Sequence, residues 1–310
     1  KHLDAFASGS LALGVLLLFC SGRTSVDGFI NSFAEVFDFS RGSVQIWAHE
    51  HKVLGVSTVA PRPPLDSSVI SEKISQYWRV SVVEVTGSTQ DDLTQLVADK
   101  KASNGDVIAT EFQSAGRGRL DRKFDAPATS ALMFSCYVEP QREKSDWSFL
   151  PLLTGLAAIF ALTKLDPQSS PTLKWPNDIL LSDGKVGGII AQVSGDGVTI
   201  GVGINVGMTE EELPVAHATS LALQQFSHLD RNLILSTFLT TLEELFTRWQ
   251  NGEDLRHLYN ERSATIGHDI RIEHPDGSHK NAKAVDVTPA GELILEDGSR
   301  VTVGDIVHLR

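Results

Sequence analysis

A loop of alternating glycines and arginines, Gly116–Arg119, follows the β-prone run Val107–Thr110. Glycine lets the main chain approach a ligand closely, and arginine offers a fixed cationic fork that suits phosphate and carboxylate. The pattern predicts a loop that closes over a small anion, with Gly116 and Gly118 supplying mobility. An exposed surface loop or an RNA-binding patch would use the same residue types, so the loop alone does not decide the chemistry.

Other segments of the chain also place polar residues or glycines at the ends of apolar runs. They are Gly87-Ser88-Thr89-Gln90, Gln113 at the start of the Gly-Arg loop, the KWPND run Lys174–Asp178, Lys185 with Gly187-Gly188, and the strand Gly201–Asn205. Each of them could be an ordinary turn. Their occurrence together favours one ligand site assembled at strand ends.

The order of GRGR, KWPND, a lysine seven residues after the aspartate, and GVGINV resembles the biotin protein ligases over about residues 80–310. The resemblance implies an α+β fold, with a mixed β-sheet packed with helices as in class II synthetases and a small SH3-like barrel at the C-terminus. It implies an ATP-dependent reaction with Mg²⁺ that makes biotinyl-5′-adenylate. A lysine of a biotin carboxyl carrier protein domain, part of a biotin-dependent carboxylase, then attacks the adenylate.

Residue roles follow from the resemblance by matching position. The catalytic residues are Lys185, Arg117 and Arg119. The biotin-binding residues are Ser88, Thr89, Gln90, Gln113, Arg117, Gly118, Arg119, Lys185, Gly187 and Gly188, the two last keeping the strand bare. The ATP-binding residues are Arg119, Lys174, Asn177, Asp178 and Asn205. Mg²⁺ is assigned to Asn177 and Asp178, because hard oxygen ligands suit that ion. Trp175 is expected in the core.

The text after GRGR departs from the usual pattern of the family, which has a further glycine and a tryptophan. Asp121 brings a negative charge near an anion site, and Phe124 replaces the indole with a smaller ring. Gln90 stands where asparagine is common. We expect these changes to affect loop ordering and ATP affinity rather than the chemistry.

Two other functions compete with biotin ligation. A lipoate or octanoate ligase shares the architecture, but a polar site at Ser88, Thr89 and Gln113 favours the ureido ring of biotin. A biotin-responsive repressor would need a DNA-binding segment, and residues 1–68 offer no recognition helix or basic cluster. The net charge of −12 also disfavours nucleic acid as a partner. We expect a monomer or homodimer that binds neither DNA nor membrane.

The N-terminal part of the chain lacks the regular alternation of secondary-structure patterns and turns that the remainder shows. Leu11–Cys20 resembles the apolar part of a signal peptide but is too short to span a bilayer. We therefore predict that residues 1–68 are a leader or extension, with the prolines of Ala60–Pro64 as a linker. His49 and His51 could hold a metal, but no third ligand is evident. The two cysteines form no disulfide or metal pattern, which favours a reducing, cytoplasmic location.

The elements that must position these residues are predicted from hydrophobic periodicity and turn residues. Strands are expected at 77–85, 107–111, 131–138, 173–181, 185–194 and 198–206, and helices from Thr89 to about 101, at 149–165, at 233–249 and at 254–263. Thr89 is the expected N-cap of the first helix. The helix at 149–165 is apolar on almost every face, so it is expected at the centre of the core. These elements predict a catalytic domain at 69–263 and an all-β barrel at 264–310.

Overall fold

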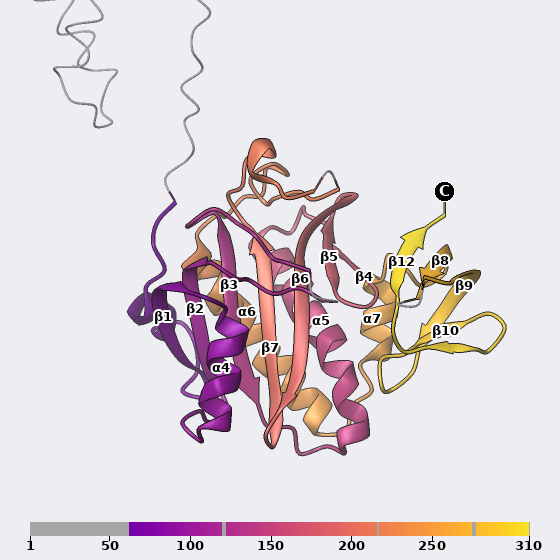
Figure 1. Ribbon diagram of the computed structural model, residues 1–310, viewed down its shortest axis with the longest axis horizontal. Coiled ribbons are helices and arrows are strands. Elements are labelled where there is room, and N and C mark those ends of the chain that lie inside the picture. Colours follow the sequence, from indigo (N-terminus) through magenta and orange to yellow (C-terminus); the bar gives the residue numbers. More distant parts are fainter. Residues whose placement is uncertain (1–61, 120–121, 216, 275–276, 310) are drawn as a thin grey trace, which may run out of the picture. The chain divides into compact units, whose positions relative to one another are not determined.

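The computed structural model describes residues 62–119, 122–215, 217–274 and 277–309. A seven-stranded sheet forms its centre (Figure 1). In spatial order its strands are β1 (Arg79–Thr86), β2 (Asp106–Gln113), β3 (Ala131–Val138), β7 (Gly197–Asn205), β6 (Gly184–Ser194), β5 (Asp178–Leu181) and β4 (Thr172–Lys174). Only the β1–β2 pair is parallel, and every other pair in this sheet is antiparallel. The predicted mixed sheet is confirmed.

Helices cover both faces of the sheet (Figure 1). One face carries α4 (Thr89–Ala98), and the other carries α5 (Leu150–Leu165) and α6 (Arg231–Gln250). The shorter helical elements are α3 (Ser67–Ser71), α7 (Arg256–Arg262), and the 3₁₀ turns Lys144–Phe149 and Glu210–Glu212. Phe134 of β3 meets Phe238 of α6 edge to face, with ring centroids 5.1 Å apart. Aromatic contact of this kind joins the helix layer to the sheet.

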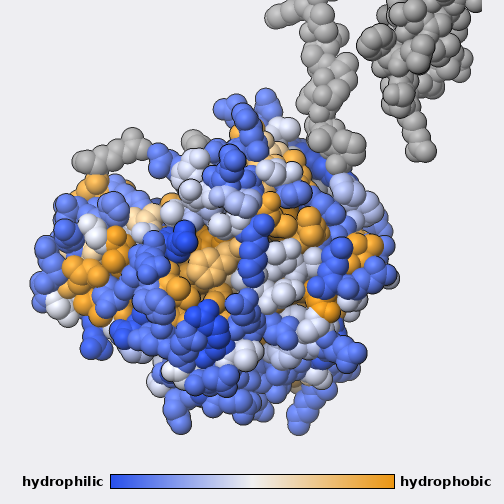
Figure 2. All heavy atoms as spheres, turned by 180° about the vertical axis from the view of Figure 1, so that it is seen from behind, coloured by the Kyte–Doolittle hydropathy of each residue, from blue (hydrophilic) through white to orange (hydrophobic). Residues whose placement is uncertain are grey.

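The helix α5 is apolar all round because it packs against both the sheet and α6. By length and composition the stretch Lys144–Leu165 could cross a membrane, but its residues are mostly buried inside the fold. Hydrophilic side chains cover most of the face seen in Figure 2, where apolar atoms show in separate patches. The prediction of a central core helix is therefore confirmed.

A second, five-stranded antiparallel sheet follows at the C-terminus. Its strands are β8 (Asp269–Glu273), β9 (His279–Val287), β10 (Leu293–Leu295), β11 (Arg300–Val301) and β12 (Asp305–His308), in the order β11-β10-β9-β8-β12. Inward residues such as Ile270, Ala284 and Leu293 are fully buried. The module is consistent with the predicted SH3-like barrel.

Two predictions about local structure were wrong. The stretch 173–181 is not one strand but the hairpin of β4 and β5, in which Lys174 pairs with Asp178. Pro176, which follows a cis peptide bond, lies in the turn because it has no N–H for a sheet ladder. The N-cap of α4 is Ser88, whose hydroxyl accepts from the N–H of Asp91, while Thr89 is the first helical residue.

The boundary at residue 68 also needs correction. Residues 62–68 pack on the catalytic domain: Leu65 is buried in the main core, and Asp66 caps α3. Because Arg62–Leu65 contact β2 and α6, they are not a free linker. The apolar run Leu11–Cys20 and the pair His49 and His51 lie outside the described residues.

Candidate active site

One cavity of about 530 Å³ opens between the large sheet, the Gly-Arg loop and the barrel. It brings together residues from strands, loops and the start of α4 that are far apart in the sequence. The predicted site residues that line it are Ser88, Thr89, Gln90, Gln113, Arg117, Gly118, Arg119, Lys174, Asn177, Asp178, Lys185, Gly187, Gly188 and Asn205. Trp175 is only 1% exposed and packs beneath, as expected. The separate sequence segments therefore form a single site.

One end of the cavity is a buried network of neutral polar groups. The N–H of Thr89 donates to Gln113 Oε1 at 2.8 Å, and the hydroxyls of Thr89 and Ser135 are 2.9 Å apart. Ser135 also donates to Gln90 Oε1 at 3.2 Å. Gly201 leaves room for Gln90, since a Cβ there would stand 2.7 Å from Gln90 Oε1. The helix start, the end of β2 and the middle of β3 thus present mixed donors and acceptors without net charge.

Ser135 is a site residue that sequence reasoning missed. It lies in the apolar strand β3 and is completely buried, so the strand pattern presents it as a core position. A hydroxyl inside such a strand needs a hydrogen-bond partner. That requirement was the available signal, but only the fold shows that the partners are Thr89 and Gln90.

The other end of the cavity carries charge. Lys185 Nζ lies 2.6 Å from Asp178 Oδ1, and both side chains are partly exposed. The Asn177 side chain bridges two elements: its Oδ1 accepts from Arg119 at 3.1 Å, and its Nδ2 donates to the carbonyl of Ile189 at 2.8 Å. Asn205 donates from Nδ2 to the carbonyl of Thr219 at 2.9 Å. Cations and carboxylates here neutralise each other, so an anionic ligand can replace Asp178 as the partner of Lys185.

The two predicted arginines have different environments. Arg117 pairs with Asp91 of α4 at 2.5 Å, where both side chains are about half exposed. The side chain of Arg119 is 23% exposed and lies 3.6 Å from Asp305 of the barrel. Burial lowers the pKa of Arg119 from its ordinary value, and the charges of Asp305 and Asp178 oppose that shift. Arg119 is therefore the arginine held inside the cavity.

Arg122 and Asp305 form a further ion pair that the sequence did not predict. Asp305 lies 183 residues after Arg122 and belongs to the barrel, so no local pattern relates the two. Their contact joins the Gly-Arg loop to the second module. The barrel strand β12 thus forms one wall of the site.

Backbone hydrogen bonds join the two described arms of the Gly-Arg loop, residues 116–119 and 122–124. Phe124 N–H donates to the carbonyl of Gly116 at 2.9 Å, and Gly118 N–H donates to that of Arg122 at 2.7 Å. A Cβ at Gly116 would lie 2.2 Å from the Phe124 carbonyl oxygen. Gly116 is thus required by close approach of two backbones. Asp121 lies outside the described residues.

Phe124 and the paired glycines shape the floor of the cavity. The ring of Phe124 lies over Gly203, where a Cβ would stand 2.6 Å from it. A Cβ at Gly187 would stand 2.5 Å from the Gly203 carbonyl oxygen, whereas one at Gly188 would stand 3.6 Å from the end of Lys185 and 3.9 Å from the Asn177 carbonyl oxygen. Gly187 is therefore needed by sheet packing, and Gly188 alone leaves space beside the lysine.

The cavity offers oxygen ligands for Mg²⁺ only as part of an open site. Among the described residues no three His, Cys, Asp or Glu side chains are grouped as a metal site would need. Asp178 and the amide oxygen of Asn177 are hard donors at the charged end of the cavity, and both face a cationic side chain. Mg²⁺ commonly takes one or two protein carboxylates together with substrate phosphates and water. These two residues match that arrangement and not a closed cage.

The fold and cavity define a class of protein that holds a small molecule between a mixed α+β domain and a C-terminal barrel. The sequence profile of the biotin/lipoate A/B protein ligase family matches residues 82–208. The biotin–[acetyl-CoA-carboxylase] ligase of Mycobacterium tuberculosis is 38% identical over 260 residues, which span 80% of this chain and 97% of that protein. The bifunctional ligase/repressor BirA of Escherichia coli is 32% identical over 54% of each chain.

Solved structures with the same architecture include the biotin protein ligase of Aquifex aeolicus in complex with biotin and ATP. It is 24% identical, has a TM-score of 0.64, and matches 74% of this chain and 98% of that one. At this identity the likeness establishes the fold. The Mycobacterium relative, which this chain matches over nearly its whole length at 38% identity, shows that the chain belongs to the biotin protein ligase family.

Proposed function

We propose that the protein is an ATP-dependent ligase that activates biotin as biotinyl-5′-adenylate and transfers it to a lysine of a biotin carboxyl carrier protein domain. Family membership supports this function. The observation that carries it is a cavity with a neutral polar end at Thr89, Gln113 and Ser135 and a cationic end at Lys185 and Arg119. Biotin has a neutral ureido ring at one end and a carboxylate at the other.

The polar end would bind the ureido group. Thr89 and Ser135 carry hydroxyls that can both donate and accept, and Gln90 offers an amide. These side chains already bond to one another in a buried network, so their orientations are set before a ligand enters. Such a site would favour an acid with matching polar atoms, because only that acid adds hydrogen bonds to these oriented groups.

Lys185 and Arg119 would act in the first chemical step. A carboxylate oxygen of biotin attacks the α-phosphorus of ATP, and the bond to the bridging oxygen breaks as pyrophosphate leaves. Two anions must approach each other, so preorganised cations lower the barrier by offsetting their repulsion and the charge that develops. Lys185 would exchange Asp178 for the two substrate oxygens. Arg119 and Asn177 would hold the phosphate side of the nucleotide together with Lys174 and Asn205.

The substrate-borne Mg²⁺ would be bound by Asp178 and Asn177 and would neutralise the triphosphate. In the second step the amine of the acceptor lysine attacks the carbonyl carbon of the mixed anhydride. The C–O bond to AMP then breaks, and an amide forms with loss of the amine proton. The hairpin at Gly116–Phe124 would shield the anhydride from water. Arg117, at the exposed edge, would order that hairpin through Asp91.

The alternatives are less well supported by the site. Lipoate and octanoate have a dithiolane or alkyl end, which would form no ureido-type hydrogen bonds with the polar groups at Thr89 and Ser135. A repressor function would require DNA binding, which the net charge of −12 disfavours. We propose a cytoplasmic enzyme whose partners are biotin, ATP and the carrier domain of a carboxylase, and which acts as a monomer or homodimer without DNA or a membrane.

Transfer to an isolated biotin carboxyl carrier domain tests the proposal. Intact-mass spectrometry should show one biotinyl group added per carrier domain only when ATP, Mg²⁺ and biotin are all present. A carrier domain with its acceptor lysine changed to arginine should remain unmodified. Modification by lipoate but not biotin would support the other ligase activity. A gel-shift on a biotin operon promoter tests the repressor alternative.

A further inference from the structure

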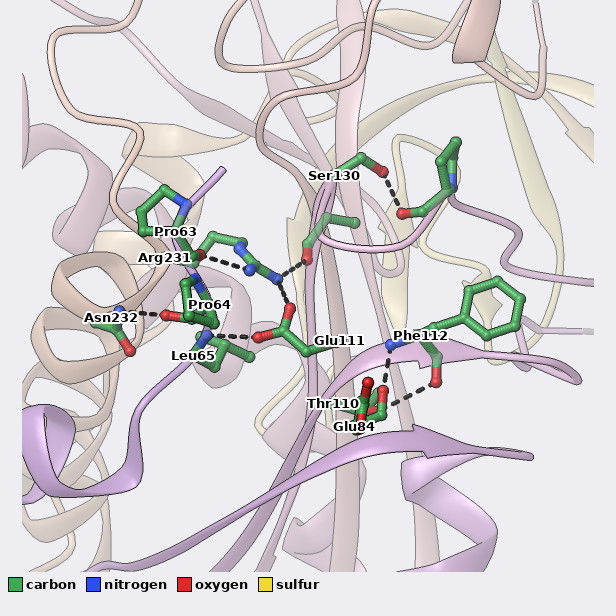
Figure 3. Close-up of polar contacts among 12 residues, drawn as sticks. Pro63, Pro64, Leu65, Glu84, Thr110, Glu111, Phe112, Ser130, Arg231 and Asn232 are labelled. Carbon is green, nitrogen blue, oxygen red and sulfur yellow. Dashed lines mark hydrogen bonds and ion pairs between the residues drawn. The ribbon is translucent and has the colours of Figure 1, made fainter. Parts of the chain in front are cut away.

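The extended segment Arg62–Asp66, here called the N-terminal strap, is held by polar side chains of β2 and α6 (Figure 3). Arg231 Nη2 donates to the carbonyl of Pro63 at 2.8 Å. Asn232 donates to the carbonyl of Pro64 at 3.0 Å and accepts from the N–H of Asp66 at 2.8 Å. The strap is therefore bound through its main chain at successive residues.

The groups that hold the strap include a buried ion pair. Arg231 is 2% exposed and lies 2.6 Å from Glu111, whose other carboxylate oxygen accepts the N–H of Leu65 at 2.5 Å (Figure 3). Arg231 also donates to the carbonyl of Ala131 at 3.3 Å. Burying charges is costly unless they are paired and fully hydrogen-bonded. Both members of this pair bind the strap and neither lines the candidate active site, so the pair serves to seat the strap.

Arg62 extends from the strap to the end of β7. Its guanidinium donates to the carbonyl of Gly207 and forms an ion pair with Glu212 at 2.6 Å. Arg62 covers Gly207 closely, since a Cβ there would stand 3.2 Å from Arg62 Nε. Glu212 also accepts the N–H of Thr209 at 2.9 Å. Arg62 thus fixes both the carbonyl that follows β7 and the short turn after it.

The chain fixed by Arg62 leads directly into the candidate active site. Gly207 is two residues past Asn205, and its N–H donates to the carbonyl of Ser130 at 2.7 Å. Further along, Lys185 N–H donates to the His217 carbonyl at 2.9 Å, and Thr219 N–H donates to the Lys185 carbonyl at 2.8 Å. The same segment therefore sets the backbone of Lys185 and the amide of Asn205, which bonds to Thr219.

We propose that Arg62 is a positioning residue for the nucleotide side of the active site. It acts through Gly207 and Glu212 on Asn205 and Lys185, and the buried pair of Arg231 and Glu111 keeps it in place. This inference rests on the proposed ligase function. The polar end that would bind the ureido ring is formed by α4, β2 and β3 and is independent of Arg62.

Steady-state kinetics of pyrophosphate release tests this role in the full chain. Arg62→Ala should raise the KM for ATP roughly tenfold, because small displacements of positioned groups have large kinetic effects. Biotin affinity, measured by calorimetry without ATP, should fall less than ATP affinity, because the contacts at the polar end stay in place and only the carboxylate contact of Lys185 is affected. Arg62→Lys should restore part of the ATP affinity, since an ammonium can still reach Glu212 but makes fewer bonds. Arg248→Ala, which breaks an exposed ion pair with Glu253 far along α6, is the matched control and should leave both values unchanged.

An equal rise in the KM for ATP and in the dissociation constant of biotin, or no change in either, would overturn the proposal. If Arg62→Ala fails to fold, Glu212→Gln provides the second variant. It should weaken the binding of ATP more than the binding of biotin. A wild-type protein that releases no pyrophosphate with biotin would instead contradict the ligase function. In that case calorimetric ATP binding by the same variants still tests Arg62, with unchanged binding as the contrary result.

Discussion

At the scale of single residues, the candidate active site is a set of charged groups that are already paired. Lys185 is held by Asp178, Arg119 by Asn177 and Asp305, and Arg117 by Asp91. Each cation is therefore oriented before substrate enters. We infer that substrate anions replace carboxylates one for one, which limits the reorganisation needed during the reaction.

Removing the lysine tests this account of the chemistry. Lys185→Ala should lower the rate of biotinyl-adenylate formation by roughly 100-fold or more, because the two reacting anions lose their shared cation. The thermal midpoint should change little, since the Lys185–Asp178 pair is partly exposed. Single-turnover measurement of adenylate gives the rate. Lys280→Ala, which removes another ion-paired lysine in the barrel, should form adenylate at the wild-type rate. An undiminished rate in Lys185→Ala would show that Lys185 does not belong to the site.

The sequence predicted residues that lie within short motifs and missed those that depend on folding. Lys174 and Asn177 belong to KWPND, and Lys185 follows seven residues after its aspartate. A local pattern was therefore sufficient to predict them. Ser135 is hidden in an apolar strand, and Asp305 comes from a different module. Long-range contacts of this kind are set by topology and leave no local trace.

At the scale of elements, the paired strands β6 and β7 explain why glycines occur in the site. Gly187 has no room for a Cβ because the Gly203 carbonyl oxygen would lie 2.5 Å away, and that oxygen belongs to rigid backbone. Gly188 faces the flexible end of Lys185 and the Asn177 carbonyl oxygen, both at ordinary contact distance from an added Cβ. The two neighbouring glycines therefore have different roles, which their sequence could not distinguish.

An alanine pair separates the two roles. Gly187→Ala should destabilise the protein by about 1–3 kcal/mol, because the added methyl forces the sheet to shift. Gly188→Ala should leave the urea midpoint nearly unchanged, because the added methyl would stand at ordinary contact distance from Lys185 and from the Asn177 carbonyl oxygen. Urea unfolding followed by circular dichroism measures the first effect. Equal midpoints for the two variants would contradict this assignment.

The turn Glu210–Glu212 provides a prediction about pH. The hydrogen bond from Arg62 lowers the pKa of Glu212 below its ordinary 4.5, burial opposes that shift, and the Thr209 N–H and the charge of Arg62 lower it further. A carboxylate whose pKa is depressed by folding stabilises the fold at pH values above its pKa in the unfolded chain. This contribution is lost as the pH falls through its pKa in the folded protein. The thermal midpoint of Glu212→Gln should therefore lie below that of the wild type at pH 7. The difference should shrink below pH 4.5; a gap that does not depend on pH would be the contrary result.

Prediction of the elements succeeded where one physical signal dominated. Uniform apolarity identified α5, and short strands with turns identified the barrel. The hairpin of β4 and β5 was missed because the two strands have only three and four residues, too few to show a pattern of their own on either side of the turn at Pro176. The strap was missed because prolines suggest a linker, although its main chain is bound by Arg231 and Asn232.

At the scale of the whole molecule, the barrel forms part of the candidate active site. Trp175 connects the two modules: its main-chain N–H donates to Thr265 Oγ1 at 3.1 Å, and its indole N–H donates to the Gly291 carbonyl at 2.9 Å. Arg119 and Asp305 add a contact across the cavity. The KWPND turn therefore holds the barrel as well as lining the site.

Loss of the indole N–H should loosen the barrel. Trp175→Phe leaves the buried Gly291 carbonyl without its partner, which should cost about 1–3 kcal/mol. Hydrogen exchange should increase in β9 and β10 more than in the large sheet. Trp147→Phe removes an indole hydrogen bond to the nearby Arg142 carbonyl and is the matched control. Uniform exchange changes in both variants would argue against a specific link between the modules.

The central claim is that the cavity activates biotin rather than another acid. Pyrophosphate release should be measured with ATP and Mg²⁺ and with biotin, lipoate or octanoate as the sole acid. Because Thr89, Gln113 and Ser135 form a polar buried end, biotin should support release far better than either other acid. Release with lipoate or octanoate but not with biotin would contradict the proposed function.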